Sequence, residues 1–176
     1  MNIGVFGGSF NPVHNGHLLL AQNILKAGVV DELWFVVSPQ NPLKDKALLL
    51  NDEERLDCVR KATQHVKGVY VSDIEFHLPK PSFMFQTLRS IQSVHKDDHL
   101  FLIIGADNWH CFNKWKNYDE ILTKYSLLIY PRSGYPIDIS SLPKNVCYLD
   151  LPTYDISSTQ VRQMLSEGKD ISNLVP

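Results

Sequence analysis

Residues 100–104 have the sequence Leu-Phe-Leu-Ile-Ile, an uninterrupted run of apolar side chains, and Gly105-Ala106-Asp107 follows directly. A strand that faces water on one side alternates apolar and polar residues, whereas a parallel strand covered on both faces is apolar throughout. The change to small residues and then an acidic one ends the run. This stretch therefore predicts a central strand of a parallel sheet.

On either side of that strand, short β-rich runs alternate with segments typical of helices. The predicted strands are Ile3–Phe6, Leu33–Ser38, Val69–Ser72, Leu100–Ile104, Leu127–Tyr130 and Val146–Leu149. The predicted helices are Gly16–Ala27, Asp52–Val66, Phe85–Val94, Tyr118–Lys124 and Ser158–Glu167. Strands that alternate with helices form βαβ units with right-handed crossovers. We therefore expect an α/β fold with a doubly wound, mainly parallel sheet, in a single domain over residues 1–176.

The composition is that of an ordinary globular protein and argues against several classes. The 176 residues include 17 basic and 19 acidic side chains, a net charge of −2, so binding of nucleic acid through bulk charge is not expected. Three widely spaced cysteines argue against a disulfide framework and indicate a reducing compartment. Neither a targeting signal nor an apolar run of the roughly 18–20 residues of a membrane span is visible. We expect a cytoplasmic protein without a membrane partner.

The segment Gly7–His17, Gly-Gly-Ser-Phe-Asn-Pro-Val-His-Asn-Gly-His, comes directly after the first predicted strand. Its glycines allow the backbone to approach a ligand closely, and the helix predicted from Gly16 directs free N–H groups toward the same place. This arrangement suits a phosphate group. The spacing matches neither the Rossmann dinucleotide motif nor the Walker motif, and a plain tight turn is the structural alternative.

Two histidines at the start of that helix are candidate ligand-binding residues. His14 and His17 lie three residues apart, so they share one face of the helix at its positive end. Surface or capping roles are the simpler alternative. A zinc site would need further ligands, and the candidates Asp107, His110 and Cys111 have no recognisable metal-binding spacing.

A second motif, Ile156–Arg162, has the sequence Ile-Ser-Ser-Thr-Gln-Val-Arg. Ser157 with Gln160 matches the capping-box pattern that begins a helix, and Gly168 is a plausible residue to end it. Hydroxyl groups beside free N–H groups, with Arg162 one turn later, predict a second anion site. A well-capped last helix is the alternative.

A third group follows the buried run described first. Ligands of open α/β sheets bind beyond the carboxyl ends of the strands, which is where Asp107 is expected. An acidic side chain there can bind ribose hydroxyls, and an aromatic side chain such as Trp109 or Trp115 can stack on a flat ring. A helix cap and a core position are equally simple roles for Asp107 and Trp115.

In combination, these segments resemble the nucleotidyltransferases with the H-x-G-H signature, and most closely the nicotinate-nucleotide adenylyltransferases. Residues 7–17 match that family's opening pattern throughout, and residues 156–162 match its I-S-S-T-x-[IV]-R pattern. Three intervening segments resemble it as well: Pro81-Ser82-Phe83 with Thr87-Leu88, Gly105-Ala106-Asp107 with Trp115, and Arg132 with Gly134. The resemblance covers essentially the whole chain. It implies a Rossmann-like nucleotidyltransferase fold and transfer of AMP from ATP to nicotinate mononucleotide in NAD biosynthesis.

The resemblance also implies roles for the matching residues. His14 and His17 are the expected catalytic residues at the ATP phosphates, and Mg²⁺ is expected to bridge phosphate oxygens rather than occupy a protein cage. The expected ATP-binding residues are Gly7, Gly8, Ser9, Phe10, His14, His17, Gly105, Asp107, Ile156, Ser157, Ser158, Thr159 and Arg162. The expected acceptor-binding residues are Asn11, Lys44, Phe83, Met84, Trp115 and Arg132.

Two positions depart from the family pattern. Pro42-Leu43-Lys44 stands where a P-H-K sequence is usual, and Met84 stands where threonine is usual. The nearest rival function is that of a sister enzyme such as phosphopantetheine adenylyltransferase, which shares the fold and both phosphate motifs. The segments around Phe83 and Trp115 argue against it. A non-catalytic nucleotide-binding regulator is a rival from another class, and the intact histidines and Arg162 argue against that one.

Overall fold

The computed structural model describes residues 1–39 and 50–176, and within them six strands form a parallel sheet with the order β3-β2-β1-β4-β5-β6. The strands are β1 (Asn2–Gly8), β2 (Glu32–Val37), β3 (Val69–Ser72), β4 (His99–Gly105), β5 (Ser126–Tyr130) and β6 (Val146–Tyr148). All five pairings between neighbouring strands are parallel. The predicted doubly wound, parallel sheet is therefore confirmed.

Helices flank these strands, and among the described residues five of the six were predicted, in this order, whereas α4 was not predicted. They are α1 (Asn15–Lys26), α2 (Asp52–Thr63), α3 (Met84–Val94), α4 (Ala106–His110), α5 (Tyr118–Lys124) and α6 (Ser158–Ser166). Three short 3₁₀ helices, η2 (Ile74–His77), η3 (Phe112–Lys114) and η4 (Ile139–Ser141), are too brief to leave a periodic signal in the sequence. The predicted second helix ends three residues early, at Thr63, because the N–H of Val66 donates to the Thr63 carbonyl in a tighter turn.

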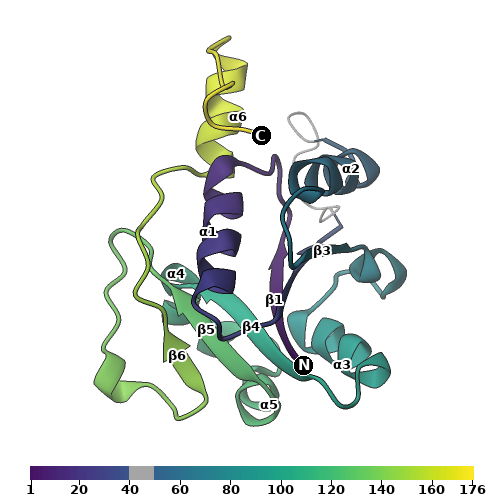
Figure 1. Ribbon diagram of the computed structural model, residues 1–176, viewed down its shortest axis with the longest axis vertical. Helices are drawn as coiled ribbons and strands as arrows, with labels where there is room; N and C mark the ends of the chain where they lie inside the picture. Colours follow the sequence, from purple (N-terminus) through teal and green to yellow (C-terminus); the bar gives the residue numbers. More distant parts are fainter. Residues whose placement is uncertain (40–49) are drawn as a thin grey trace.

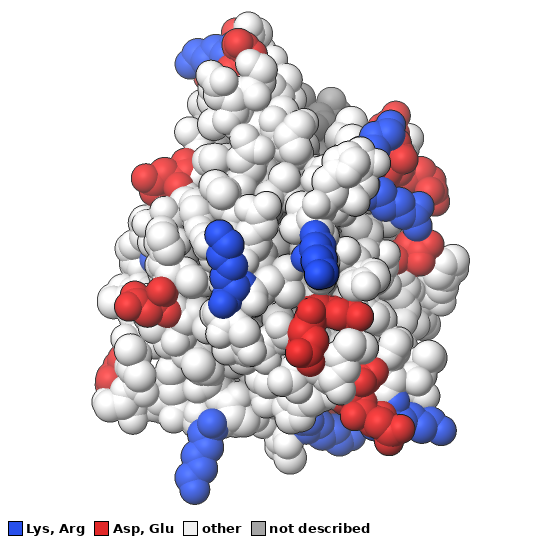
Figure 2. All heavy atoms as spheres, in the orientation of Figure 1, with Lys and Arg blue, Asp and Glu red and all other residues white. Residues whose placement is uncertain are grey.

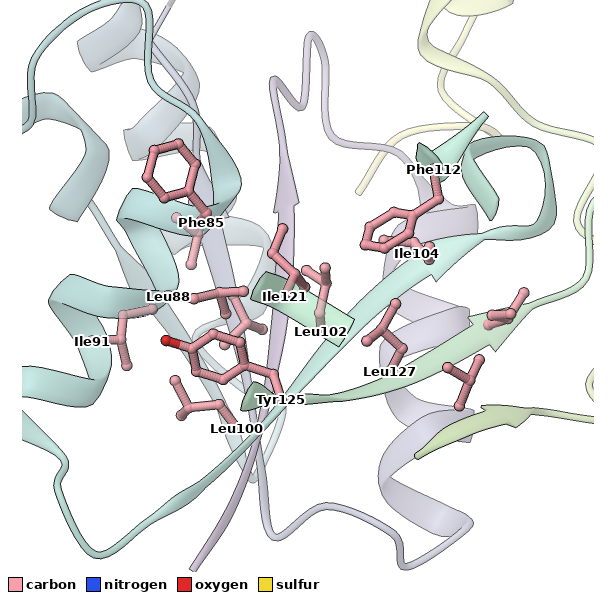
Figure 3. Close-up of a cluster of buried hydrophobic side chains, with 14 of the residues drawn as sticks. Phe85, Leu88, Ile91, Leu100, Leu102, Ile104, Phe112, Ile121, Tyr125 and Leu127 are labelled. Carbon is pink, nitrogen blue, oxygen red and sulfur yellow. The ribbon is translucent and has the colours of Figure 1, made fainter. Parts of the chain in front are cut away.

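Helices cover both faces of the sheet (Figure 1). One face carries α1 and α2, with a core that includes Leu20, Ile24, Phe35, Leu56, Val59 and Ile103. The other carries α3 and α5, with a core that includes Phe85, Leu88, Ile91, Leu102, Ile104 and Ile121 (Figure 3). Because Leu102 and Ile104 belong to one core and Ile103 to the other, the prediction that this strand is buried on both faces is confirmed.

The order of the strands reverses beside β1, and this decides where a ligand can bind. β1 pairs with β2 on one side and with β4 on the other, with Ile3 opposite Leu100 and Val5 opposite Leu102. In open α/β sheets the crevice at such a reversal, outside the carboxyl ends of the strands, is where ligands bind. The loop that follows Gly8 and the start of α4, directly after Gly105, lie at this edge of the sheet.

Charged side chains of both signs are interspersed on the face shown in Figure 2, with wide uncharged areas between them. Neither sign forms a continuous patch among the described residues on this face. That distribution agrees with the near-neutral net charge. Among the helices that the structure describes, none has the length and apolar character of a membrane span.

Candidate active site

The loop between β1 and α1 is anchored in the core by an aromatic side chain. Phe10 adopts a φ of 47°, and its ring is almost completely buried against Phe6, Phe35 and His17 at centroid distances of 5.5, 5.0 and 5.0 Å. Phe10 was predicted among the ATP-binding residues. Its side chain packs in the core, so a contact with ATP would come from its backbone.

The two histidines begin helix α1 and stack on one another. His14 is the N-cap residue, His17 is the third residue of the helix, and their ring centroids are 3.6 Å apart. The backbone N–H of His14 donates to Nδ1 of His17 over 3.0 Å. Because Nδ1 must accept this bond, the proton of the neutral His17 ring lies on Nε2. His17 is thereby prepared as an Nε2–H donor.

Both histidines are uncharged at neutral pH. Burial, and then the positive charge of Arg132, lowers the pKa of His14 from 6.5 to about 4. Burial is also the main cause that holds the pKa of His17 well below its usual value, with smaller contributions from His14 and Arg132. The pair therefore offers hydrogen bonds to an anion rather than a preformed positive charge.

A cavity of about 230 Å³ opens beside the histidines, and we call it the histidine pocket. It is lined by His14, Gly16, His17, Leu20, Tyr130, Pro131, Arg132, Ser133, Tyr135, Thr153, Tyr154, Asp155, Ile156, Ser157 and Gln160. The start of α1, the end of β5 and the segment before α6 thus form its walls. Arg132, expected among the acceptor-binding residues, lies here with the histidines.

The last motif contacts the first. Ser158 Oγ donates to the carbonyl of Pro12 over 2.8 Å, and Arg162 Nη1 donates to the carbonyl of Asn11 over 2.7 Å. A second guanidinium nitrogen of Arg162 donates to Thr159 Oγ1 over 3.1 Å. In Figure 1, α6 accordingly lies at the end of α1 where that helix begins. Side chains predicted to hold phosphates here also fix the loop that carries the histidines.

The start and end of α6 follow the sequence prediction. Ser157 is the N-cap residue, and its side chain accepts a hydrogen bond from the backbone N–H of Gln160 over 3.1 Å. Gly168 has a φ of +70°, a left-handed conformation that ends a helix at little cost for glycine. The predicted N-cap at Ser157 and the predicted stop at Gly168 are both confirmed.

The end of β4 provides a buried acceptor. A Cβ atom at Gly105 would collide with Asp107 Oδ1, so the close approach requires glycine. Asp107 Oδ1 is buried and has no hydrogen-bond partner among the described residues, and Arg132 Nε lies 3.7 Å from it. His14 Nδ1 is likewise buried without a described partner. Unpaired buried polar atoms are costly, and their presence at two predicted ATP-binding residues indicates a ligand.

A second cavity, of about 400 Å³, lies on the other side of the end of β1, and we call it the tryptophan pocket. Its lining residues are Gly7, Gly8, Ser38, Glu75, Ser82, Phe83, Met84, Lys114, Trp115 and Lys116. The fold thus brings the predicted acceptor-binding residues Phe83, Met84 and Trp115 together. Trp115 is half-buried, with its ring 5.1 Å from that of Phe112. Lys116 Nζ lies 4.6 Å from the centre of the Phe83 ring.

Comparison with known proteins agrees with this geometry. Residues 5–164 match the model of the cytidylyltransferase-like family. The chain is 44% identical over 171 residues to the probable nicotinate-nucleotide adenylyltransferase of Bacteroides thetaiotaomicron, with 97% of this chain and 85% of that protein covered. It is 45% identical over 168 residues to the protein of the same name from Bacteroides fragilis, with 96% and 84% covered.

This chain belongs to the nicotinate-nucleotide adenylyltransferase family. The fold agrees as well. The structure of Plasmodium falciparum nicotinic acid mononucleotide adenylyltransferase complexed with NaAD matches with a TM-score of 0.84 at 20% identity, covering 99% of this chain and 90% of that one. The resemblance found in the sequence is thereby confirmed.

Several residues to which the resemblance implies a ligand-binding role do not line the histidine pocket. Gly7 and Gly8 line the tryptophan pocket rather than the histidine pocket. Asn11 is buried and lines neither pocket. The carbonyl of Ser9 accepts a hydrogen bond from Arg55. Lys44 and the departure at Leu43 lie outside the described residues.

A buried arginine that belongs to none of the motifs holds the segments after β1 and β2. Arg55 is 1% exposed and donates to the carbonyls of Ser9 and Ser38 over 2.5 and 2.8 Å, and to Asp52 Oδ1 over 2.6 Å. Arg55 therefore links the residues that directly follow β1 and β2. The sequence contained an indication of this burial, because Arg55 lies one helical turn before the buried Val59 and so falls on the buried face of α2.

The zinc alternative finds no support in the part of the chain that the structure describes. No group of three His, Cys, Asp or Glu residues in residues 1–39 and 50–176 is arranged to hold a metal ion. Of its candidate ligands, His110 contacts the carbonyl of Pro136 through Nε2 over 2.8 Å.

Proposed function

We propose that this chain transfers the adenylyl group of ATP to nicotinate mononucleotide, releasing pyrophosphate and forming nicotinate adenine dinucleotide. The observation that carries the proposal is the pair of pockets at the end of β1, one with two stacked histidines and one with Trp115. Relatives 44–45% identical over nearly the whole chain are named for this activity.

The histidine pocket would receive ATP. The N–H of Gly16, which has no partner among the described hydrogen bonds, and the Nε2–H of His17 would donate to the α-phosphate, where charge shifts as pyrophosphate leaves. The unpaired Asp107 Oδ1 would accept a hydrogen bond from a ribose hydroxyl. With no metal-binding cluster of protein side chains among the described residues, Mg²⁺ would be held by the ATP phosphates and would neutralise charge on the leaving pyrophosphate.

The tryptophan pocket would receive the acceptor. A phosphate oxygen of nicotinate mononucleotide attacks the α-phosphorus, the bond from that phosphorus to the bridging oxygen breaks, and pyrophosphate departs with the bonding electrons. Because a phosphate monoester is already ionised near neutral pH, the chain needs no general base. Its contribution is alignment of two anions, with Trp115 stacking on the pyridine ring and Arg132 between the two phosphate groups.

Met84 is compatible with this role despite replacing the usual threonine. It is the first residue of α3, and its backbone N–H has no partner among the described hydrogen bonds. Its Cε lies 2.6 Å from where a Cβ of residue 7 would be, so its side chain is packed over Gly7. The position can therefore donate its N–H to the nicotinate carboxylate whatever its side chain is.

Three free cysteines, Cys58, Cys111 and Cys147, fit a reducing compartment, and we include a cytoplasmic location in the proposal. Lys44 is proposed as a further contact to the acceptor's phosphate, as the resemblance implies.

The proposal is tested by pyrophosphate release from ATP and Mg²⁺ with a panel of acceptors. Turnover is expected with nicotinate mononucleotide, at about 10- to 100-fold higher kcat/KM than with the nicotinamide form, because a charge-assisted hydrogen bond is exchanged for an amide contact. Turnover of phosphopantetheine instead would identify the sister enzyme. Binding of ATP without pyrophosphate release on any acceptor would identify a regulator, and equal kcat/KM for acid and amide would contradict the assigned pyridine pocket.

A further inference from the structure

A buried carboxylate lies in the wall of the tryptophan pocket. Glu75, in η2, is 3% exposed, and it is the only acidic residue among residues 1–39 and 50–176 that is buried to this degree. Its Oε1 accepts a hydrogen bond from Thr87 Oγ1 over 2.7 Å, and its Oε2 accepts one from Ser82 Oγ over 3.1 Å. No basic side chain in the described part of the chain forms an ion pair with it.

This placement is costly, so it calls for a reason. Burying a carboxylate without a cation disfavours the folded state unless hydrogen bonds compensate, and an apolar side chain would fill the same space at lower cost. Each carboxylate oxygen of Glu75 has one hydroxyl donor, and the donors come from the two sides of one helix start. Ser82 precedes the N-cap residue Phe83, and Thr87 lies one turn inside α3.

The helix start that Glu75 holds faces the same pocket. The N–H groups of Gln86 and Thr87 both donate to the Phe83 carbonyl, over 3.0 and 3.2 Å. The N–H groups of Met84 and Phe85 have no partner among the described hydrogen bonds, as is normal for the first turn of a helix. Phe83 and Met84 line the pocket beside Trp115.

We propose that Glu75 is the positioning residue of the acceptor pocket. By fixing Ser82 and Thr87 at once, its carboxylate sets the direction in which the first N–H groups of α3 point toward the carboxylate of the acceptor. This inference rests on the proposed function, because it assigns those N–H groups to nicotinate. Glu75 acts through the helix start and needs no contact with the substrate.

Kinetics of Glu75→Ala and Glu75→Gln test the proposal. Loss of two hydrogen bonds to a charged group in Glu75→Ala is expected to raise KM for nicotinate mononucleotide about 10- to 100-fold and to leave KM for ATP within about twofold. The carboxamide of Glu75→Gln can still accept from Thr87 and pair with the hydroxyl of Ser82, which can also accept. Glu75→Gln is therefore expected to restore acceptor KM to within about threefold of the wild type.

Ser82→Ala is a second variant that tests the same proposal if Glu75→Ala does not fold. It removes one of the two hydrogen bonds at the pocket side, and acceptor KM is expected to rise about 2- to 10-fold, with KM for ATP unchanged.

The matched control is Glu120→Gln. Glu120, in α5, forms a two-pronged ion pair with Arg89 of α3 at 2.7 and 2.6 Å, so it ties down the same helix without lining the pocket. Acceptor KM should stay unchanged in Glu120→Gln.

The proposal is overturned if folded Glu75→Ala keeps its acceptor KM, or if both KM values rise equally. It is also overturned if Glu75→Gln is as impaired as Glu75→Ala, since charge rather than position would then matter. Failure of the proposed function has a different signature: wild-type protein would release no pyrophosphate with nicotinate mononucleotide.

Discussion

The histidine pocket and the tryptophan pocket lie on either side of the end of β1, and different contacts hold their walls in place. The loop that carries His14 is held by residues near the other end of the chain. Ser158 donates a hydrogen bond to the carbonyl of Pro12, and Arg162 donates one to the carbonyl of Asn11. The wall of the tryptophan pocket is held by contacts that are local in the sequence. Glu75 accepts hydrogen bonds from Ser82 and Thr87, which lie seven and twelve residues later in the chain. Substitutions in the histidine pocket should therefore change both the stability of the fold and the binding of ATP. Substitutions in the tryptophan pocket should mainly change the binding of the acceptor.

The two pockets also differ in how they treat charge. Burial keeps His14 and His17 neutral in one of them. The other has Lys114 and Lys116 exposed among its lining residues and Glu75 buried in its wall. An anion entering the histidine pocket thus meets neutral imidazoles beside the charges of Arg132 and Asp155, whereas the tryptophan pocket has two exposed lysines and a buried carboxylate.

The largest effect is expected from His17→Ala in the histidine pocket. Its Nε2–H is assigned to the α-phosphate, where a hydrogen bond strengthens in the transition state, and loss of one such donor costs about 2.7–4 kcal/mol, or roughly 100- to 1000-fold in kcat. Steady-state kinetics should show this loss with acceptor KM nearly unchanged. His14→Ala should be milder, and the exposed His65→Ala is the control. A near-normal kcat in folded His17→Ala would remove His17 from the catalytic role.

Arg162→Ala tests the long-range tie. Loss of the charged hydrogen bond to the Asn11 carbonyl is expected to lower the free energy of unfolding by about 1.5–3 kcal/mol, and therefore to lower Tm. The same loss is expected to weaken ATP binding roughly 10- to 100-fold. The resemblance implies that the anion site around Arg162 holds the outer phosphates of ATP, which AMP lacks, so calorimetric titration should show binding of AMP weakened less than binding of ATP. Equal losses for AMP and ATP would confine Arg162 to holding the loop.

Trp115→Ala tests the local pocket. A stacked aromatic ring contributes about 1–3 kcal/mol to binding of a flat base, so acceptor KM is expected to rise about tenfold with KM for ATP unchanged. Because Trp115 is only half-buried, Tm should fall by less than for a core aromatic residue. A large drop in Tm with normal acceptor KM would make Trp115 a structural residue of the α4–η3 region.

The last prediction concerns the pH dependence of stability. The pKa of His14 is about 4 in the folded protein and 6.5 in the unfolded chain, so only the unfolded chain binds this proton between those values. Stability should therefore rise with pH from about 4 to 6.5 and then level off. Thermal melting across this range should show the slope, and His14→Asn, which keeps an N-cap side chain, should reduce it; the remaining part is expected from His17, whose pKa burial also holds well below its usual value. An unchanged slope in His14→Asn would assign it to other groups.

Much of the fold follows from local sequence. Apolar runs such as Leu100–Ile104 predicted the strands to within one or two residues, because burial on both faces leaves no polar position in them. Ser157 and Gly168 predicted the ends of α6 through capping and left-handed backbone geometry, which also act within a few residues. The motif around His14 and His17 predicted that a helix begins there, and the stacked rings of these two histidines lie at the start of α1.

Only the tertiary structure decided which pocket each residue joins. Arg132 lies with the histidines, and Arg55 and Glu75 belong to no motif that identifies a site. The order of the strands brings the loop after β1 next to α6, almost the whole chain away, and separates the two pockets on either side of one strand end. The sequence by itself determined the elements and the chemical groups, because propensity, capping and apolar periodicity act over a few residues. Pairing, burial and the resulting pKa shifts depend on neighbours that only the folded sheet supplies.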